Sequence, residues 1–271
     1  MQPKLGIIAG GGTMPRSLVN HCLDTGRAYC VVALIGHAEA VHLEGVKSLH
    51  WSSIGAAGKI IDILKREEVH DLVMVGPVKR PSLMAAMPDI RGLKFLIRAG
   101  RQAFGGDNSI LSAIAGELEA EGFRVIGIDS LLQCLLTPPG VLTRVTPKND
   151  VRHSIKVGLE EARDLGSKDI GQAVVIEGTN ILAREDSGGT NDLIRRAGKL
   201  TRDKRKLILV KAKKPEQDRR VDLPTVGLET VQLAAEHGFS GIAIEAGQSL
   251  FVDKKRAIDA ADAANIFIIG V

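Results

Sequence analysis

Strand-like and helix-like segments alternate along the first half of the chain, and this alternation constrains the fold more than any other feature. Apolar runs typical of buried strands occupy Leu5–Ala9, 30–35, Asp71–Val75 and 124–128. Apolar residues at helical spacing lie between them, at 15–25, 57–67 and 108–121. Because strands that alternate with helices usually pair in parallel, we predict an α/β fold with a parallel sheet and helices on both of its faces.

A second α/β module is expected after the proline-rich segment 135–150. Two short strand patterns meet around Gly178 and indicate a hairpin. Further strands are expected at 207–210, Gly241–Ile244 and 266–270, and helices at 151–164, 226–236 and 257–264. We therefore predict an N-terminal domain over 1–134, a linker over 135–150 and a C-terminal α/β domain over 151–271, with a small-molecule cleft between the domains.

Composition argues against several classes of protein. Hydrophobic residues make up 44% of the 271 residues, yet no apolar run is long enough to span a bilayer. The three cysteines lack metal-binding spacing and form no even-numbered framework, which favours a reducing compartment, and no signal peptide is evident. We therefore expect a cytoplasmic protein. Aromatic residues contribute only 3%, so a nucleic-acid partner is not expected.

The segment 195–220 is strongly basic, although the formal net charge of the whole chain is only +4. It holds twelve Lys or Arg residues against three acids. Such a segment usually forms a solvated face. Alternatively, it attracts an anionic ligand or a phospholipid surface, to which the protein would bind peripherally.

A glycine turn follows the first strand pattern, at Gly10, Gly11 and Gly12, and Thr13 leads into a helix. Backbone amides at such a turn can approach a phosphate, and the start of a helix carries partial positive charge. A dinucleotide fingerprint would need glycine at Pro15 and an acid after the second strand, so an NAD-dependent oxidoreductase is disfavoured. Either these residues contact a substrate phosphate, or the glycines only make a close turn.

The segment LVKAKKPEQDRRVDLPTVG carries cations beside carboxylates. Lys211 and Lys214 follow a strand pattern, and Asp218 and Asp222 come after them. This combination suits phosphate chemistry, because a carboxylate can hold a divalent metal or orient water while cations offset developing charge. The alternatives are a loop of solvated ion pairs and, for Asp222, a side chain that only hydrogen-bonds the turn.

Three further residues qualify as candidates. Arg80 follows the third expected strand, where it could meet a phosphate or lie exposed. Asp107 precedes a helix and fits an N-cap. Thr190, in a second glycine turn, could cap its helix or donate a hydrogen bond to an anion. The seven histidines show no metal-binding motif, and no Ser or Cys nucleophile motif is present.

Six segments in this order resemble the UDP-2,3-diacylglucosamine pyrophosphatases of lipid A synthesis: LGIIAGGGTMP, GPVKRP, DIGQAVVIEG, KAKKPEQDRRVDLPTVG, GIAIEAGQSLFVD and IFIIGV. The resemblance covers residues 5–271, and RVDLPTVG is its most specific part. It implies a Rossmann-like N-terminal domain, a C-terminal α/β domain, substrate bound between them and a homodimer. It also implies Mg²⁺-assisted attack of water on the α-phosphorus, which releases UMP and 2,3-diacylglucosamine 1-phosphate.

The resemblance also implies roles for individual residues. Asp222 matches the essential aspartate, so it is the predicted catalytic residue and, with Asp107, a predicted Mg²⁺ ligand. The predicted substrate-binding residues are Gly10, Gly11, Gly12, Thr13, Arg80, Gln172, Thr190, Lys211 and Lys214.

The chain departs from the family pattern at three acidic positions. Asn108 replaces the second acid of a Gly-Asp-Asp motif, and Gly188 and Asn191 replace the two acids of a Glu-Gly-Thr-Asp motif. An amide oxygen can still bind a hard cation, but Gly188 supplies no side chain. The runner-up hypothesis is therefore a catalytically weakened or inactive protein of the same fold that binds a nucleotide sugar or lipid.

Overall fold

The structure is a computed structural model that describes residues 2–78, 89, 92, 107–200 and 206–271. The chain forms two compact units. The first contains Met1–Gln133 together with Asp218–Asp222, and the second contains Cys134–Gln217 and Leu223–Val271. The chain thus leaves the second unit after Gln217 and rejoins it at Leu223.

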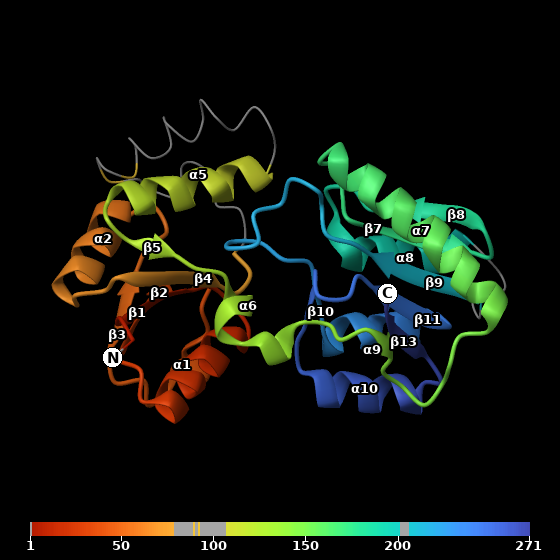
Figure 1. The fold of residues 1–271 in the computed structure, drawn as a ribbon, viewed down its shortest axis with the longest axis horizontal. Coiled ribbons are helices and arrows are strands. Elements are labelled where there is room, and N and C mark those ends of the chain that lie inside the picture. The colour runs from red at the N-terminus through yellow and green to blue at the C-terminus, as the bar shows by residue number, and fades with distance from the viewer. Residues whose placement is uncertain (1, 79–88, 90–91, 93–106, 201–205) are drawn as a thin grey trace. The chain divides into compact units, whose positions relative to one another are not determined.

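The first unit is built on a parallel sheet of five strands, in the order β3-β2-β1-β4-β5. The strands are β1 (Leu5–Ala9), β2 (Tyr29–Leu34), β3 (Leu49–Ser52), β4 (Asp71–Val75) and β5 (Arg124–Val125). Its helices include α1 (Met14–Thr25), α2 (Ala57–Arg66), α5 (Asp107–Ala120) and α6 (Ile128–Leu131), with a 3₁₀ turn at Ala40–Leu43. Figure 1 shows α2 and α5 on one face of this sheet and α1 on the other. This order of parallel strands is that of the first five strands of a Rossmann-like fold, as expected.

The elements of the first unit follow from the sequence pattern. All five residues of β1 are buried, which suits a central strand covered on both faces. The helix α1 begins with Pro15 in its first turn and ends at Gly26, whose left-handed conformation (φ 67°) closes the helix. Apolar side chains of α2 and α5 pack with Cys30, Val32 and Leu34 on one face of the sheet.

The second unit contains a mixed sheet of six strands, in the order β6-β13-β11-β9-β7-β8. The strands are β6 (Gly140–Val141), β7 (Ala173–Glu177), β8 (Asn180–Arg184), β9 (Leu207–Lys211), β11 (Gly241–Ile244) and β13 (Phe267–Gly270). The strands β9, β11 and β13 are parallel, whereas β7 pairs antiparallel with both β8 and β9. A separate parallel pair joins β10 (Thr225–Val226) and β12 (Leu250–Phe251).

Alternate residues of these strands form two cores. One face of the sheet packs against α8 (Gly189–Leu200), α9 (Leu228–Glu236) and α10 (Lys254–Ala263), and the other packs against α7 (Asn149–Ser167). Figure 1 shows α7 on the face opposite α9 and α10. The α/β class is therefore confirmed in both units.

Some expected elements have different bounds. The strand expected at 124–128 ends at Val125, because only Arg124 and Val125 pair with β4, and Ile128 already begins α6. The strand β3 was not expected, since its sequence LHWS is short and only partly apolar. The helix expected from 226 begins at Leu228, and β6 lies within the predicted linker.

Candidate functional site

One edge of the second sheet gathers polar side chains from four strands. Lys211 ends β9, Glu185 follows β8, Gln172 precedes the antiparallel β7, and Glu245 follows β11. Because β9 and β11 are parallel and β7 runs the other way, all four positions fall at the carboxyl edge of the parallel strands. Ligands of open α/β sheets bind at this edge.

A buried network links three of the predicted substrate-binding residues through Glu185. The Thr190 hydroxyl donates to Glu185 Oε1 (2.6 Å) and accepts from Lys211 Nζ (3.0 Å). The backbone amide of Gln172 donates to Glu185 Oε2 (2.7 Å), and Lys211 Nζ also donates to the Thr225 carbonyl (3.2 Å). Glu185 is 5% exposed and Lys211 6%, so both charges are largely withdrawn from water. The network therefore fixes the Lys211 ammonium in place.

Unpartnered polar atoms lie at the same edge. The side-chain oxygen of Gln172 is buried and has no hydrogen-bond partner among the described residues. The same is true of the hydroxyls of Thr137, which precedes β6, and Ser249, which follows β11; the Thr137 backbone amide donates to the Ser249 carbonyl. A buried acceptor without a partner costs free energy, so such atoms are candidates for contact with a ligand or water.

Lys214, the fourth predicted substrate-binding residue of the second unit, binds a residue outside this network. Its Nζ donates to Asp169 Oδ1 at 2.6 Å, and its stem packs against Gly166 at the end of α7. The neighbouring Lys213 amide donates to Glu245 Oε2, and Glu245 also pairs with Arg163. The structure thus brings Gln172, Thr190 and Lys211 together through Glu185, and shows Lys214 in a different ion pair.

Asp222 belongs to the segment that the second unit contributes to the first. It is half-buried, and its amide donates to the Asp218 carbonyl at 3.0 Å. Ion pairs hold the segment: Arg219 binds Asp129 (2.8 Å), and Arg220 binds Asp218 and Glu119 (2.7 Å each). The hydrogen bond to Asp218, together with Glu119, raises the pKa of Arg220. The residues just before Asp222 are thus held within the first unit.

The glycine turn is a close-packed crossing of two backbones. The Gly10 and Gly11 amides donate to the carbonyls of Val75 and Pro77. A Cβ at Gly10 would lie 2.5 Å from the Gly76 carbonyl oxygen, so glycine is required there for packing. Gly12 has a φ of 77°, and its amide donates to the Glu39 carboxylate at 2.9 Å. In this structure, therefore, all three amides already have protein acceptors.

The remaining candidates are placed as follows. Thr13 is the N-cap residue of α1, but its side chain makes no capping hydrogen bond. Arg80 lies outside the described residues. Asp107 is the first residue of α5, one position later than the N-cap expected for it.

Carboxylates lie beside two of the three replaced acidic positions. A Cβ at Gly188 would lie 2.9 Å from a carboxylate oxygen of Asp192, which pairs with Arg196. The Asn191 amide donates to Glu229 Oε1 at 2.8 Å. The replacements therefore do not strip this part of the chain of negative charge.

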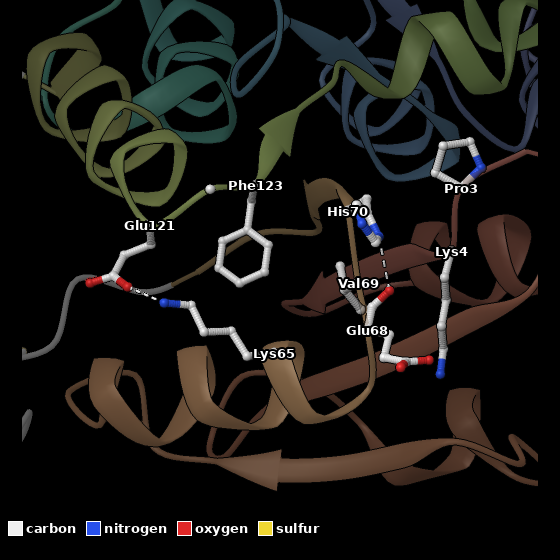
Figure 2. Close-up of a pocket in the computed structure, with 9 residues that line it drawn as sticks. Pro3, Lys4, Lys65, Glu68, Val69, His70, Glu121 and Phe123 are labelled. Carbon is white, nitrogen blue, oxygen red and sulfur yellow. Dashed lines mark hydrogen bonds and ion pairs between the residues drawn. The ribbon is translucent and has the colours of Figure 1, made fainter.

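A pocket of about 780 Å³ lies in the first unit, at the edge of its sheet where the parallel strands begin. Figure 2 shows its lining, which includes Lys4, Val69, His70 and Phe123. These residues precede β1, β4 and β5, so the pocket is at the amino ends of the parallel strands. Ligand loops of such sheets follow the carboxyl ends, so we do not assign the reaction to this pocket.

Several charges of the basic segment are neutralised within the described residues. Arg196 pairs with Asp186 and Asp192, and the lysine and arginine pairs given above account for others. Arg195 and Lys199 are exposed on α8, next to Leu200, which is 59% exposed. Across the described ranges, no helix combines the length and apolar character that crossing a membrane requires.

Sequence reasoning missed Glu185, the residue that joins the network. Its signal was available: it directly follows a strand pattern and lies five residues before Thr190. A single acid after a strand is common, however, and only the pairing of β7 with β8 and β9 brings it to Gln172 and Lys211.

Comparison with known proteins gives two family matches that follow each other along the chain. The model of the LpxI N-terminal domain matches residues 4–135, and that of the LpxI C-terminal domain matches residues 138–269. The chain is 40% identical over 275 residues to the UDP-2,3-diacylglucosamine pyrophosphatase LpxI of Caulobacter vibrioides (strain ATCC 19089 / CIP 103742 / CB 15). The alignment covers 99% of this chain and 97% of that protein.

Two solved structures show weaker similarity. One is N5-carboxyaminoimidazole synthase from Aspergillus clavatus, with 12% identity and a TM-score of 0.25 over 74% of this chain and 44% of that chain. The other is glycinamide-RNase-transformylase T from Mycobacterium tuberculosis, with 14% identity and a TM-score of 0.24 over 68% of this chain and 44% of that chain.

Proposed function

The chain belongs to the LpxI family, and from this premise we propose that it is a UDP-2,3-diacylglucosamine pyrophosphatase of lipid A biosynthesis. It hydrolyses the pyrophosphate bond of its substrate to give UMP and 2,3-diacylglucosamine 1-phosphate. The observation that carries this proposal is 40% identity across 99% of the chain to a curated enzyme of that name.

The second sheet offers groups that suit a diphosphate. We propose that Lys211 donates to a phosphate oxygen, because a buried ammonium in a dry site interacts strongly with an anion. Thr190, Gln172 and Lys214 are proposed to complete the polar contacts on this side. The Glu185 carboxylate has a different role: it holds Thr190 and, through Thr190, the Lys211 side chain.

The reaction needs a group that orients or deprotonates water, and we propose Asp222 for this role. A half-buried carboxylate can accept a proton from water, and its backbone is anchored by the Asp218 carbonyl. Gly10, Gly11, Gly12, Thr13 and Arg80 are proposed as contacts for other parts of the substrate, as the sequence motif suggests. The amides of the three glycines bind protein acceptors, so for these residues the proposal rests on the sequence motif.

We also propose Mg²⁺ as cofactor, with Asp222 and Asp107 as its protein ligands. In the part of the chain that the structure describes, Asp222 does not lie in a group of three or more ligating His, Cys, Asp or Glu side chains. The two carboxylates of Asp222 and Asp107 fit Mg²⁺, because proteins commonly hold this ion with one or two carboxylates while water and substrate phosphate complete its shell. When bound, Mg²⁺ would withdraw charge from the phosphate that water attacks.

An assay for UMP tests the proposed function. Purified protein with UDP-2,3-diacylglucosamine and Mg²⁺ should release UMP and 2,3-diacylglucosamine 1-phosphate in equal amounts. Binding of the intact substrate without release of UMP would contradict the proposal and favour the second candidate, an inactive binding protein. That candidate is motivated by the replacements at Asn108, Gly188 and Asn191.

We expect Lys211→Met to lower kcat/KM about 10²–10³-fold, the scale on which loss of one preorganised electrostatic donor acts. Methionine keeps the apolar stem but removes the ammonium that donates to Thr190 and to the Thr225 carbonyl. Steady-state UMP release measures the effect. Lys168→Met is the matched control, because Lys168 is exposed in the same unit and pairs only across one turn with Asp164. Equal losses of kcat/KM in both variants would show that Lys211 has no specific role in the reaction.

We propose that the protein is cytoplasmic, associates peripherally with the anionic surface of the inner membrane and forms a homodimer. The exposed cations and Leu200 of α8 support membrane contact, although ion pairs neutralise several other charges of the segment. The protein should sediment with anionic vesicles at low salt and be released at high salt, because salt screens such contacts. Arg195→Gln with Lys199→Gln should weaken this binding. Equal binding to neutral vesicles would contradict the electrostatic mechanism.

A further inference from the structure

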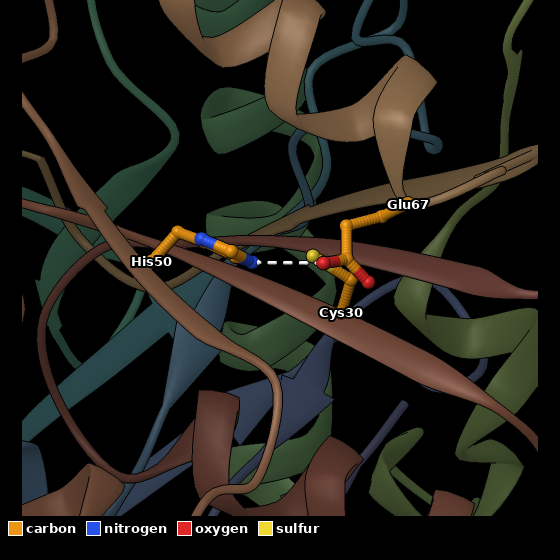
Figure 3. A group of neighbouring side chains, drawn as sticks. All are labelled: Cys30, His50 and Glu67. Atoms are coloured by element: carbon orange, nitrogen blue, oxygen red, sulfur yellow. Dashed lines mark hydrogen bonds and ion pairs between the residues drawn. The ribbon is translucent and has the colours of Figure 1, made fainter.

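A cysteine, a histidine and a glutamate that have no assigned role in the reaction meet on one face of the first sheet. Cys30 lies on β2, His50 on the neighbouring β3, and Glu67 follows the last residue of α2. One ligating atom from each side chain lies within 4.8 Å of the other two. Figure 3 shows the Cys30 sulfur next to the Glu67 carboxylate oxygen to which His50 is hydrogen-bonded.

The backbone explains why these three side chains converge. His50 pairs with Val32, and Cys30 is two residues before Val32, so Cys30 and His50 are on the same face of the sheet. Cys30 and Val32 pack with the apolar side chains of α2, which covers this face. Glu67, at the C-cap of α2, is thereby brought over the two strands.

The distances suit a small coordination shell. His50 Nε2 lies 3.2 Å from Glu67 Oε1, close to the edge of about 3.3 Å that a tetrahedral ion with bonds of about 2.0 Å would give. The second carboxylate oxygen, Oε2, accepts from Lys4 Nζ (2.7 Å) and from the Ser48 hydroxyl (3.3 Å). These contacts hold the carboxylate from outside, as hydrogen bonds to metal-binding side chains commonly do.

We infer that Cys30, His50 and Glu67 form a binding site for a thiophilic divalent cation of the zinc type, with a water as fourth ligand. Thiolate, imidazole and carboxylate are the donors that Zn²⁺ takes, whereas Mg²⁺ and Ca²⁺ avoid sulfur. The ion would join β2, β3 and the end of α2, so its role would be to stabilise the first unit. This site is separate from the Mg²⁺ site proposed above and does not depend on the proposed function.

The surroundings are compatible with such an ion. Cys30 is fully buried, while the side chains of His50 and Glu67 are 34% and 26% exposed, so an ion can reach the sulfur from their side. Burial raises the pKa of the Cys30 thiol, so the ion must displace a proton. A buried sulfur of this kind is poorly placed to attack a substrate, which argues against a nucleophilic role for the same trio.

Cobalt spectroscopy tests the inference. Reduced, chelator-treated protein that carries Cys134→Ser, to remove the exposed thiol, should bind one Co²⁺ with a thiolate-to-cobalt charge-transfer band that Zn²⁺ abolishes. A large excess of Mg²⁺ should leave the band unchanged. Zn²⁺ should also raise the thermal midpoint of the first unit, because it binds only the folded state.

Matched variants identify the ligands. Cys30→Ser should abolish the band, and His50→Ala and Glu67→Gln should each weaken Co²⁺ binding at least about tenfold. Cys22→Ser and His70→Ala are the controls and should leave binding unchanged, since Cys22 is the other buried cysteine of this unit and His70 is exposed. If Cys30→Ser fails to fold, the two partly exposed positions decide the question. Unchanged Co²⁺ affinity in His50→Ala and Glu67→Gln, or no band in the folded parent, would overturn the inference.

Discussion

Asp222→Ala should lower turnover about 10²–10⁴-fold, the contribution of a positioned acid or base, while the protein stays folded. The backbone of the segment should persist, because the Arg219–Asp129 and Arg220–Glu119 ion pairs and the Asp222 amide do not involve this carboxylate. In the absence of Mg²⁺, substrate affinity should be kept or rise, since a carboxylate facing a diphosphate repels it when no cation intervenes. Single-turnover UMP release and direct substrate binding separate the two effects.

Two acids that shortly precede Asp222 in the chain serve as controls. Glu216 is exposed, so Glu216→Gln should leave turnover unchanged. Asp218 accepts hydrogen bonds from the Arg220 amide and guanidinium, so Asp218→Ala should loosen the segment and cost far less turnover than Asp222→Ala. If Asp222→Ala keeps normal turnover, or loses it only because the thermal midpoint collapses, Asp222 is a turn residue.

Asp71→Ala should reduce the free energy of unfolding of the first unit by about 3–5 kcal/mol, the usual cost of breaking a buried ion pair. The Asp71 carboxylate, 3% exposed, accepts from Arg27 Nη2 at 2.5 Å and from Arg124 Nε at 2.7 Å. The Arg27 side chain is 5% exposed, so its charge would be left buried with one fewer partner. Urea unfolding followed by tryptophan fluorescence measures this, because the single tryptophan, Trp51, is on β3 of that unit.

The same ion pair predicts a pH dependence. Burial by itself raises the pKa of Asp71, but hydrogen bonds and charges of Arg124 and Arg27 outweigh it, so the pKa of this carboxyl is lowered. A lowered folded-state pKa stabilises the protein above the unfolded value of about 3.9, and this stability is lost as pH falls through the folded value. Asp71→Ala should therefore differ from the parent most at neutral pH and least below that window.

Lys65→Met is the matched control for Asp71→Ala. It removes an ion pair with Glu121 in the same unit, but Lys65 is 48% exposed. Exposed pairs contribute about 0–1 kcal/mol, so the shift in urea midpoint should be small. Equal shifts for the two variants would mean that Asp71 acts as an ordinary surface acid.

The fold could be predicted from the sequence where a local pattern sufficed. The runs at Leu5–Ala9 and Asp71–Val75 form strands with the expected bounds. A short, mostly apolar run that ends at a turn is typical of a strand buried on both faces in a parallel sheet. The hairpin around Gly178 also forms as expected, with φ of 59° at that glycine. The shorter strand β3 could not be predicted, since its half-polar sequence is stabilised by pairing with β2.

The sequence by itself determined the family, the α/β class, and Gln172, Thr190 and Lys211 as candidates, because motif order, apolar periodicity and residue chemistry are local properties of the chain. Only the tertiary structure decided that these residues meet through Glu185, that the glycine amides bind protein acceptors, and that Asp218–Asp222 belongs to the first unit. It alone also brought Cys30, His50 and Glu67 together. The physical reason is that strand pairing, register and helix packing set distances between residues far apart in sequence, and no local pattern encodes them.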